Sequence, residues 1–363
     1  MIDKILLFPY WLTLKVRHFM YDHGMKKVSC ADVPTICIGN ITVGGTGKTP
    51  HTEMVLRTLM QDEVWGSKKL AVLSRGYKRN TKGFQQVVSD GTAKEYGDEP
   101  MQIKRKFPTV TVAVDKSRKQ GCDFLTGPDK VQTSRKARRC RHKEFPKADL
   151  IILDDAFQHR ALKPTVSIVL VDYSRPIFTD HLMPLGKLRD LPERLKTADI
   201  VVVSKCPPFM DTWEKSKWME SLKANGCTKN IFFTSIGYDA PESAFPEGDS
   251  RYIYTKNLIL FSGIANDFPL RKYLSSTYKI IRHFDFPDHH RFTWADISTI
   301  ARAAHSYPTS VIMTTEKDCQ RIRDCKSIPD NLKQRMFYTP IKVNFFSDEE
   351  REAFTSVLNG YLK

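Results

Sequence analysis

One stretch of this 363-residue chain decides its fold class: Gly39-Asn40-Ile41-Thr42-Val43-Gly44-Gly45-Thr46-Gly47-Lys48-Thr49-Pro50. It directly follows a short apolar run, Pro34-Thr35-Ile36-Cys37-Ile38, so the sequence predicts a strand that leads into a glycine-rich loop and then a helix. Such a loop directs successive backbone N–H groups toward one point, where phosphate binds readily. The loop departs from the standard spacing, because Thr42 stands where that pattern has glycine.

The residues of this loop are predicted to have different roles in binding a nucleotide. Lys48 can reach the terminal phosphates of a bound nucleotide, and the Thr49 hydroxyl can ligate Mg²⁺. We expect the phosphates to be held by Thr42, Val43, Gly44, Gly45, Thr46, Gly47, Lys48 and Thr49.

Further apolar runs alternate with helix-like stretches downstream of this loop. Near-continuous apolar runs of this length are typical of strands buried on both faces, and with intervening helices they indicate a doubly wound, mostly parallel sheet. Functional residues then lie at the carboxyl ends of the strands. The predicted strands are residues 35–38, 70–73, 110–114, 150–153, 167–171 and 200–203.

The pattern of alternating apolar runs and helix-like stretches changes near residue 229. A Pro- and Gly-rich stretch follows soon afterwards. A second, smaller α/β domain is expected beyond it, with strands at 258–261, 279–283, 311–314 and 336–343. The predicted division is an N-terminal helix at 1–28, a loop-bearing core at 29–228, a linker at 229–257 and a C-terminal domain at 258–363.

Composition describes a soluble globular protein that is strongly basic, with 41% hydrophobic residues, 27% charged residues and a net charge of +16. A basic surface attracts nucleic acid, anionic membranes or phosphorylated substrates. Eight Lys or Arg fall within residues 130–147, either as a solvated face or as a nucleic-acid contact. Aromatic residues are nearly absent there, so base stacking has no support and no nucleic-acid partner is expected.

The eight cysteines do not have the spacing of zinc ligands, so we interpret them as reduced thiols.

The N-terminus carries an uncharged run at residues 5–14, flanked by Lys4, Lys15 and Arg17. The run is too short to span a bilayer as a helix, and no small-residue cleavage site follows it. Aromatic residues beside basic ones suit a helix that lies in a membrane interface. An ordinary helix docked on the core is the alternative.

Two acidic sites stand out. The apolar run 150–153 ends in Asp154 and Asp155, and a strand of this kind beside a phosphate loop supplies acids that hold Mg²⁺. Asp98 and Glu99 lie between Gly97 and Pro100, which alone indicates an exposed turn. An Asp and a His from separate domains can form a proton-accepting pair across a cleft, but the spacing does not show that they meet.

The motifs taken in order resemble the tetraacyldisaccharide 4′-kinases, the lipid A 4′-kinases of Gram-negative bacteria. The resemblance covers nearly the whole chain. It rests on Gly39 to Pro50, Ser74-Arg75-Gly76-Tyr77, Gly97-Asp98-Glu99-Pro100, Leu153-Asp154-Asp155-Ala156-Phe157-Gln158-His159, Pro184-Leu185-Gly186-Lys187-Leu188-Arg189-Asp190, Phe261-Ser262-Gly263-Ile264-Ala265, Phe286-Pro287-Asp288-His289 and Thr314-Thr315-Glu316-Lys317-Asp318. Ala156 replaces the family's usual Gly, and Asp190 replaces its usual Glu.

The resemblance implies a P-loop kinase that transfers the γ-phosphate of ATP, with Mg²⁺, to the 4′-hydroxyl of an acylated glucosamine disaccharide 1-phosphate lipid. It implies a peripheral enzyme on the cytoplasmic face of the inner membrane, with an N-terminal membrane-interface helix. Asp98 matches the family's catalytic base, assisted by His289, and Lys48 serves the transferring phosphate. Asp154 and Asp155 match the metal-site acids. The matched substrate-binding positions are Arg75, Gln158, His159, Arg189 and Asp190.

The alternative function is a P-loop ATPase or GTPase of the metallochaperone type. Guanine recognition usually requires an Asn-Lys-x-Asp loop. The corresponding stretch here is Ser204-Lys205-Cys206-Pro207, which lacks both the Asn and the Asp and so argues against GTP.

Overall fold

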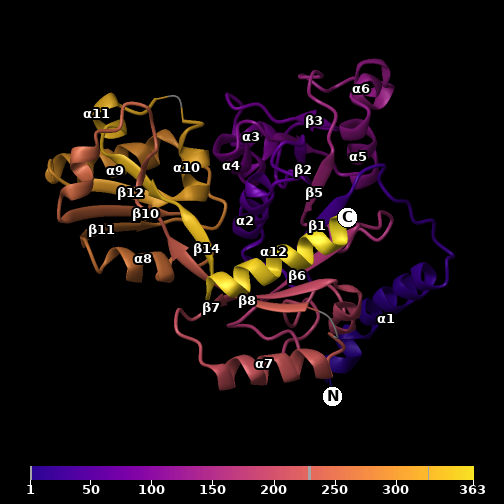
Figure 1. Ribbon diagram of the computed structural model, residues 1–363. Coiled ribbons are helices and arrows are strands. Elements are labelled where there is room, and N and C mark those ends of the chain that lie inside the picture. Colours follow the sequence, from indigo (N-terminus) through magenta and orange to yellow (C-terminus); the bar gives the residue numbers. More distant parts are fainter. Residues whose placement is uncertain (1, 228–229, 326) are drawn as a thin grey trace.

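A nine-stranded sheet organises most of the chain in the computed structural model, which describes residues 2–227, 230–325 and 327–363 (Figure 1). Its strands lie in the order β14-β8-β7-β6-β1-β5-β2-β4-β3. Neighbours pair in parallel except at the two edges, where β14 and β3 are antiparallel to their partners. The bounds are β1 (Thr35–Asn40), β2 (Leu70–Ser74), β3 (Gln85–Gln86), β4 (Thr111–Val114), β5 (Leu150–Asp154), β6 (Val166–Asp172), β7 (Ile200–Cys206), β8 (Asn230–Tyr238) and β14 (Ile341–Phe345).

Both faces of this sheet are buried, which explains why its strands read as continuous apolar runs. In β1, Ile36 and Ile38 pack on one side while Cys37 packs on the other. The side of Cys37 is covered by α1 (Ile2–Asp22), α5 (Arg118–Thr126) and α7 (Thr212–Ala224). The opposite side is covered by α2 (Lys48–Gln61), α4 (Asp98–Lys106) and α12 (Asp348–Leu362). The predicted mixed α/β fold with a large, mostly parallel sheet is confirmed.

A second, five-stranded sheet has the order β11-β10-β12-β13-β9, parallel except for β9. Helices α9 and α10 pack on one of its faces and α8 on the other. The bounds are β9 (Glu242–Ser243), β10 (Asn257–Ser262), β11 (Lys279–Asp285), β12 (Val311–Thr315), β13 (Met336–Thr339), α8 (Phe268–Leu274), α9 (Trp294–Ser306), α10 (Glu316–Ile322) and α11 (Asp330–Lys333). The remaining short helices are α3 (Ala93–Tyr96), α6 (Asp129–Thr133) and the 3₁₀ turns Arg135–Ala137, Pro192–Thr197 and Ser250–Tyr254.

The C-terminal end of the chain does not stay with the second sheet. The single strand predicted at 336–343 is wrong, because Pro340 has no N–H to donate and separates β13 from β14. β13 pairs with β12, whereas β14 pairs with β8, so residues 341–362 return to the first sheet (Figure 1). The predicted linker at 229–257 likewise contains β8 and β9. The boundaries at 229–257 and 258–363 therefore do not follow the sheets.

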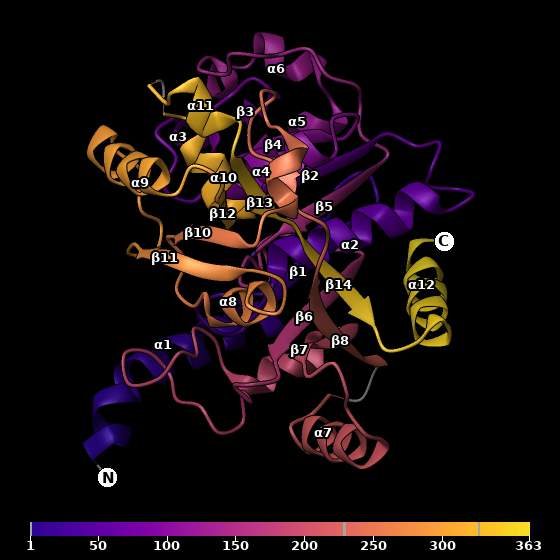
Figure 2. The same cartoon turned by 90° about the vertical axis from the view of Figure 1, so that its left-hand side faces the viewer.

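The two sheets meet where α10 lies against α4, as both views show (Figures 1 and 2). The contact is ionic. Lys106 Nζ lies 2.6 Å from Glu53 Oε2 and 2.7 Å from Glu316 Oε1, and Lys317 Nζ lies 2.6 Å from Glu99 Oε1. Each sheet with the helices packed on it forms one unit of the fold. Ion pairs that are mostly buried require good geometry to offset their desolvation, so this contact fixes how the two units lie against each other.

The basic segment 130–147 forms α6, a 3₁₀ turn and irregular chain. Val131, Ala137 and Cys140 are buried and attach the segment to the core, while all of its Lys and Arg except Lys143 are exposed. The segment is therefore a solvated surface attached by a few apolar side chains.

Helix α1 has two distinct faces. Leu7, Tyr10, Leu14 and His18 face the protein. On the outer side the larger exposed side chains are Phe8, Trp11, Leu12, Val16 and Phe19. Within the described part of the chain, no helix combines the length and the apolar character needed to cross a bilayer.

Candidate active site

The glycine-rich loop joins β1 to α2 and is fixed from both sides. Gly44 and Gly47 have φ values of 104° and 84°, a left-handed conformation that favours glycine. Asn40 Nδ2 donates to Thr46 Oγ1 at 2.7 Å, and Ser204 Oγ, near the end of β7, donates to the Thr46 carbonyl at 2.9 Å. The loop is therefore held in shape by the strand ends on either side of it.

Two backbone N–H groups of the loop are already used within the protein. Val43 N donates to the Lys187 carbonyl at 2.6 Å, and Thr46 N donates to the Gly44 carbonyl at 2.9 Å. The predicted phosphate contacts of Val43 and Thr46 would therefore require these bonds to open, whereas Gly47 precedes α2 without a side-chain cap on that helix.

Lys48 and Thr49 occupy the first turn of α2, where helix N–H groups and dipole favour anions. Lys48 Nζ lies 3.8 Å from Asp155 Oδ1. Thr49 is buried. One turn later, His51 Nδ1 lies 2.7 Å from the Gly47 carbonyl, and burial lowers the pKa of His51 to about 4. His51 is therefore a neutral support for the loop.

Asp154 ends β5 beside the loop and Asp155 follows it directly, and the surroundings of the two acids differ. Asp154 is buried, and among the described residues its carboxyl oxygens accept only from hydroxyls, Ser74 Oγ at 3.1 Å and Thr52 Oγ1 at 3.4 Å. Burial, and then the charges of Glu99 and Asp155, raise its pKa to about 6. Lys48 and Arg118 lower the pKa of Asp154 only in part, so Asp154 is a buried acid without an ion pair of its own among the described residues.

Asp155, in contrast, is already paired with cationic side chains of the protein. The Arg189 guanidinium forks onto both of its oxygens, and Lys48 lies nearby. Burial alone would raise the pKa of Asp155, but Lys48 and Arg189 together hold it below its ordinary value. Its φ of 48° shows that the strand turns sharply here.

Asp98 and His289 meet across the contact between the two units. His289 Nδ1 lies 3.2 Å from Asp98 Oδ2, although the two residues are 191 positions apart. Asp98 opens α4 rather than lying in an exposed turn. Burial favours a raised pKa for Asp98, but the hydrogen bond from His289 and the charge of Arg321 hold it below its ordinary value. Asp98 is therefore ionised at neutral pH.

The predicted substrate-binding residues divide into two groups. Gln158 Nε2 donates to the Asn40 carbonyl at 2.5 Å, and Arg189 Nη2 donates to Asn40 Oδ1 at 2.5 Å, so both lie at the strand edge beside the loop. Arg75 is exposed just after β2. Burial and the charges of Arg118, Arg17 and Arg75 lower the pKa of His159, which indicates a cationic neighbourhood.

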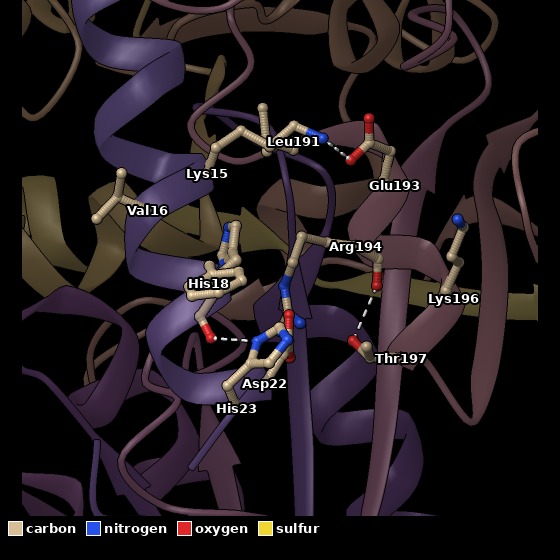
Figure 3. Close-up of a pocket in the computed structure, with 11 residues that line it drawn as sticks. Lys15, Val16, His18, Asp22, His23, Leu191, Glu193, Arg194, Lys196 and Thr197 are labelled. Carbon is tan, nitrogen blue, oxygen red and sulfur yellow. Dashed lines mark hydrogen bonds and ion pairs between the residues drawn. The ribbon is translucent and has the colours of Figure 1, made fainter. Parts of the chain in front are cut away.

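Asp190 points away from this edge. It is fully buried, and its Oδ1 lies 2.6 Å from His18 Nε2 on α1. Arg194 Nε lies 3.8 Å from its other oxygen, and Arg194 lines a cavity of about 520 Å³ between α1 and residues 191–197 (Figure 3). The predicted substrate contact of Asp190 is therefore not what this geometry favours; Asp190 holds α1 in place.

Three residues at the site were not predicted from the sequence. Glu99 follows Asp98, and its charge acts on both Lys48 and Asp155, so the start of α4 is coupled to the glycine-rich loop. Lys317 and Arg321 come from α10 and pair with Glu99 and Asp98. Lys317 lies in Thr314-Thr315-Glu316-Lys317-Asp318, a motif of the family resemblance, but the contacts of α10 are long-range and leave no local pattern.

The fold and the loop define an α/β protein with a glycine-rich loop after the first strand of a mostly parallel sheet. A crystal structure of LpxK from Aquifex aeolicus, an "apo" form in complex with ATP, shares this fold with a TM-score of 0.73, 24% sequence identity and 100% coverage of both chains.

A family model described as Tetraacyldisaccharide-1-P 4′-kinase matches residues 4–362. The Tetraacyldisaccharide 4′-kinase of Phocaeicola vulgatus is 38% identical over 357 residues, which cover 96% of this chain and 91% of that protein. The enzyme of the same name from Flavobacterium johnsoniae is 35% identical over 350 residues, covering 95% and 94%. The chain belongs to the tetraacyldisaccharide-1-P 4′-kinase family and is thus a kinase, as the resemblance implied.

The raised pKa of Asp154 predicts a specific pH dependence of stability. Between its ordinary value of 3.8 and about 6, the native state binds more protons than the unfolded state, so stability falls as pH rises through this window. We expect Asp154→Asn to raise the melting temperature of the ligand-free protein at pH 7 and to leave it unchanged near pH 4, measured by scanning calorimetry. Asp123→Asn, at an exposed carboxyl, is the matched control. Equal melting shifts at both pH values would contradict the assignment.

Proposed function

We propose that this chain transfers the γ-phosphate of ATP to the 4′-hydroxyl of a tetraacyldisaccharide 1-phosphate lipid, forming lipid IVA in lipid A biosynthesis. The observation that carries the proposal is the convergence of three groups at one place. The loop with Lys48, the acids of β5 and the pair of Asp98 with His289 are connected through Glu99, which pairs with Lys317 and acts on Lys48. Phosphoryl transfer requires such positioning and charge neutralisation above all.

ATP and Mg²⁺ fit the residues of this edge. Thr49, Asp154 and Asp155 would hold Mg²⁺, and Asp154 is the better direct ligand because Asp155 is already paired with Arg189 and Lys48. Mg²⁺ is commonly held by one or two carboxylates together with substrate phosphates. When bound, the ion neutralises phosphate charge. The backbone around Gly47 and the ammonium of Lys48 would hold the phosphates of ATP.

Asp98 is the proposed proton acceptor for the sugar hydroxyl. A general base must be unprotonated when the substrate binds, and the lowered pKa of Asp98 keeps it so. His289 orients the carboxylate through its Oδ2. Arg75, Gln158 and His159 lie near the same edge and are proposed to contact the acceptor, while Arg189 fixes Asp155 and Asn40.

The outer face of α1 supports a membrane-surface location, which we propose to be the cytoplasmic face of the inner membrane. Its exposed apolar side chains form one stripe, since Phe8, Leu12, Val16 and Phe19 recur at helical spacing. Lys15 pairs with Glu193 and Arg17 donates to the Gln158 carbonyl, so the apolar stripe rather than these two cations supports the membrane contact. A helix of this kind lies in the interface and presents a lipid acceptor to the site.

The test of this function is direct phosphate transfer. Wild-type protein with radiolabelled ATP, Mg²⁺ and detergent-solubilised tetraacyldisaccharide 1-phosphate is expected to yield a labelled bisphosphate lipid. Lys48→Ala is expected to abolish the label, because the transferring phosphates lose their cation, whereas Lys147→Ala on the exposed basic segment is expected to retain it. ATP hydrolysis without any labelled lipid would refute the assigned acceptor.

The apolar stripe of α1 predicts membrane partitioning. Replacing Phe8, Leu12, Val16 and Phe19 together with serine is expected to move the protein from sedimenting anionic vesicles to the supernatant, since binding scales with buried apolar area. The control replaces Val64 and Tyr254, which are exposed elsewhere, with serine. Unchanged vesicle binding of the α1 variant would place the membrane contact on another surface.

A further inference from the structure

Arg321 reaches from α10 of the second sheet to the carboxylate of Asp98 on α4. Its side chain is only 5% exposed. Nε lies 2.8 Å and Nη2 lies 2.6 Å from the same oxygen, Asp98 Oδ2. The other end of the guanidinium is held within the second unit, since Nη1 lies 2.7 Å from Asp318 Oδ1 and 2.9 Å from the Gly263 carbonyl. All three nitrogens of Arg321 are therefore used, and the fork cannot turn without breaking several bonds.

This arrangement distinguishes the two oxygens of Asp98. Oδ2 accepts from Arg321 and faces His289 Nδ1 at 3.2 Å. In the described part of the chain, Oδ1 has no hydrogen bond of its own to another residue. The guanidinium thus occupies one oxygen and leaves the other for an incoming hydroxyl.

Arg321 also contacts His289 directly. His289 Nδ1 lies 3.1 Å from Arg321 Nη2 and 3.2 Å from Asp98 Oδ2. A protonated Nδ1 donates to Asp98, while an unprotonated Nδ1 accepts from Arg321, so one atom cannot satisfy both neighbours at once. Arg321 therefore provides a partner for His289 in the state in which it makes no bond to Asp98.

We propose that Arg321 is a positioning residue for phosphoryl transfer: it holds the carboxylate of Asp98 so that Oδ1 faces the acceptor hydroxyl, and it provides His289 with an alternative partner. This role rests on the proposed function. Arg321 lies on α10, which packs on the second sheet. The carboxylate of Asp98, the proposed proton acceptor, is therefore correctly oriented only when α10 contacts α4.

The guanidinium also affects the charge of the carboxylate. Burial favours a raised pKa for Asp98, and the hydrogen bond from His289 together with the charge and hydrogen bond of Arg321 lowers it, so loss of Arg321 would raise the pKa of Asp98. The charged and titratable groups around Asp98 are Glu99 on α4, Lys317, Asp318 and Arg321 on α10, Asp324 after α10, and Asp288 and His289 from the loop after β11.

The experiment measures lipid phosphorylation against pH for the full chain and its variants. Arg321→Gln is expected to lower kcat by roughly 10²-fold, because a misplaced base costs about that much, with the KM for ATP nearly unchanged. The acid limb of its pH profile is expected to move to higher pH. Arg321→Lys keeps the charge but not the planar fork, so kcat is expected to fall while the acid limb stays near that of the wild type.

The matched control is Arg105→Gln. Arg105 lies on the same contact, with Nη1 2.5 Å from Gln320 Oε1, but it does not touch Asp98. It is expected to leave kcat and the acid limb unchanged. An unshifted acid limb in Arg321→Gln, or an equal loss of kcat in Arg105→Gln, would overturn the positioning role.

Two further outcomes are decisive. Should Arg321→Gln fail to fold, a wild-type kcat in Arg321→Lys would overturn the role, and a reduced kcat with the acid limb retained would support it. A wild-type chain that labels no lipid at any pH would overturn the proposed function itself, and this role with it. An active wild type with an unaffected Arg321→Gln would overturn this role alone.

Discussion

The ionic contact between α4 and α10 is the constraint on which the rest of the site depends. Lys106 is placed between Glu53 and Glu316, and Lys317 pairs with Glu99, so several charges lose water together when the two units meet. Burial and the neighbouring Glu316 raise the pKa of Glu53 to about 7 even with Lys106 beside it. Such a cluster tolerates little misalignment, because an unpaired charge in it is costly. The same contact brings His289 to Asp98.

The second constraint is the imbalance of charge at the carboxyl edge of the first sheet. Asp155 is paired with Arg189 and Lys48, and Glu99 is paired with Lys317, whereas Asp154 is buried beside the charges of Glu99 and Asp155 and has no ion pair among the described residues. Helix α2 begins at this edge with Lys48 and Thr49, so nucleotide phosphates would arrive where backbone N–H groups already favour anions. In the proposed function, the buried acid and the glycine-rich loop would together suit a nucleotide with its Mg²⁺ better than either component alone.

The sequence predicted the first sheet well because its strands are buried on both faces, and continuous apolar runs such as residues 150–153 are what double burial requires. It placed Asp154, Asp155 and the glycine-rich loop correctly at strand ends for the same reason. It failed at 336–343, where apolar pattern alone cannot show that Pro340 divides two strands of different sheets. The meeting of Asp98 with His289, and the roles of Glu99 and Arg321, depend on contacts between distant segments, which no local pattern records.

Different parts of the fold supply Asp98 and His289, and the proposed function requires the two residues to act as one unit. A double-mutant cycle on kcat for lipid phosphorylation, with Asp98→Asn, His289→Gln and the double variant, tests this most directly. Residues that act as a unit lose function non-additively, so the double variant is predicted to be about as slow as Asp98→Asn alone. If the two losses multiply in full, the residues contribute independently, and the account of a single proton-accepting pair across the contact is contradicted.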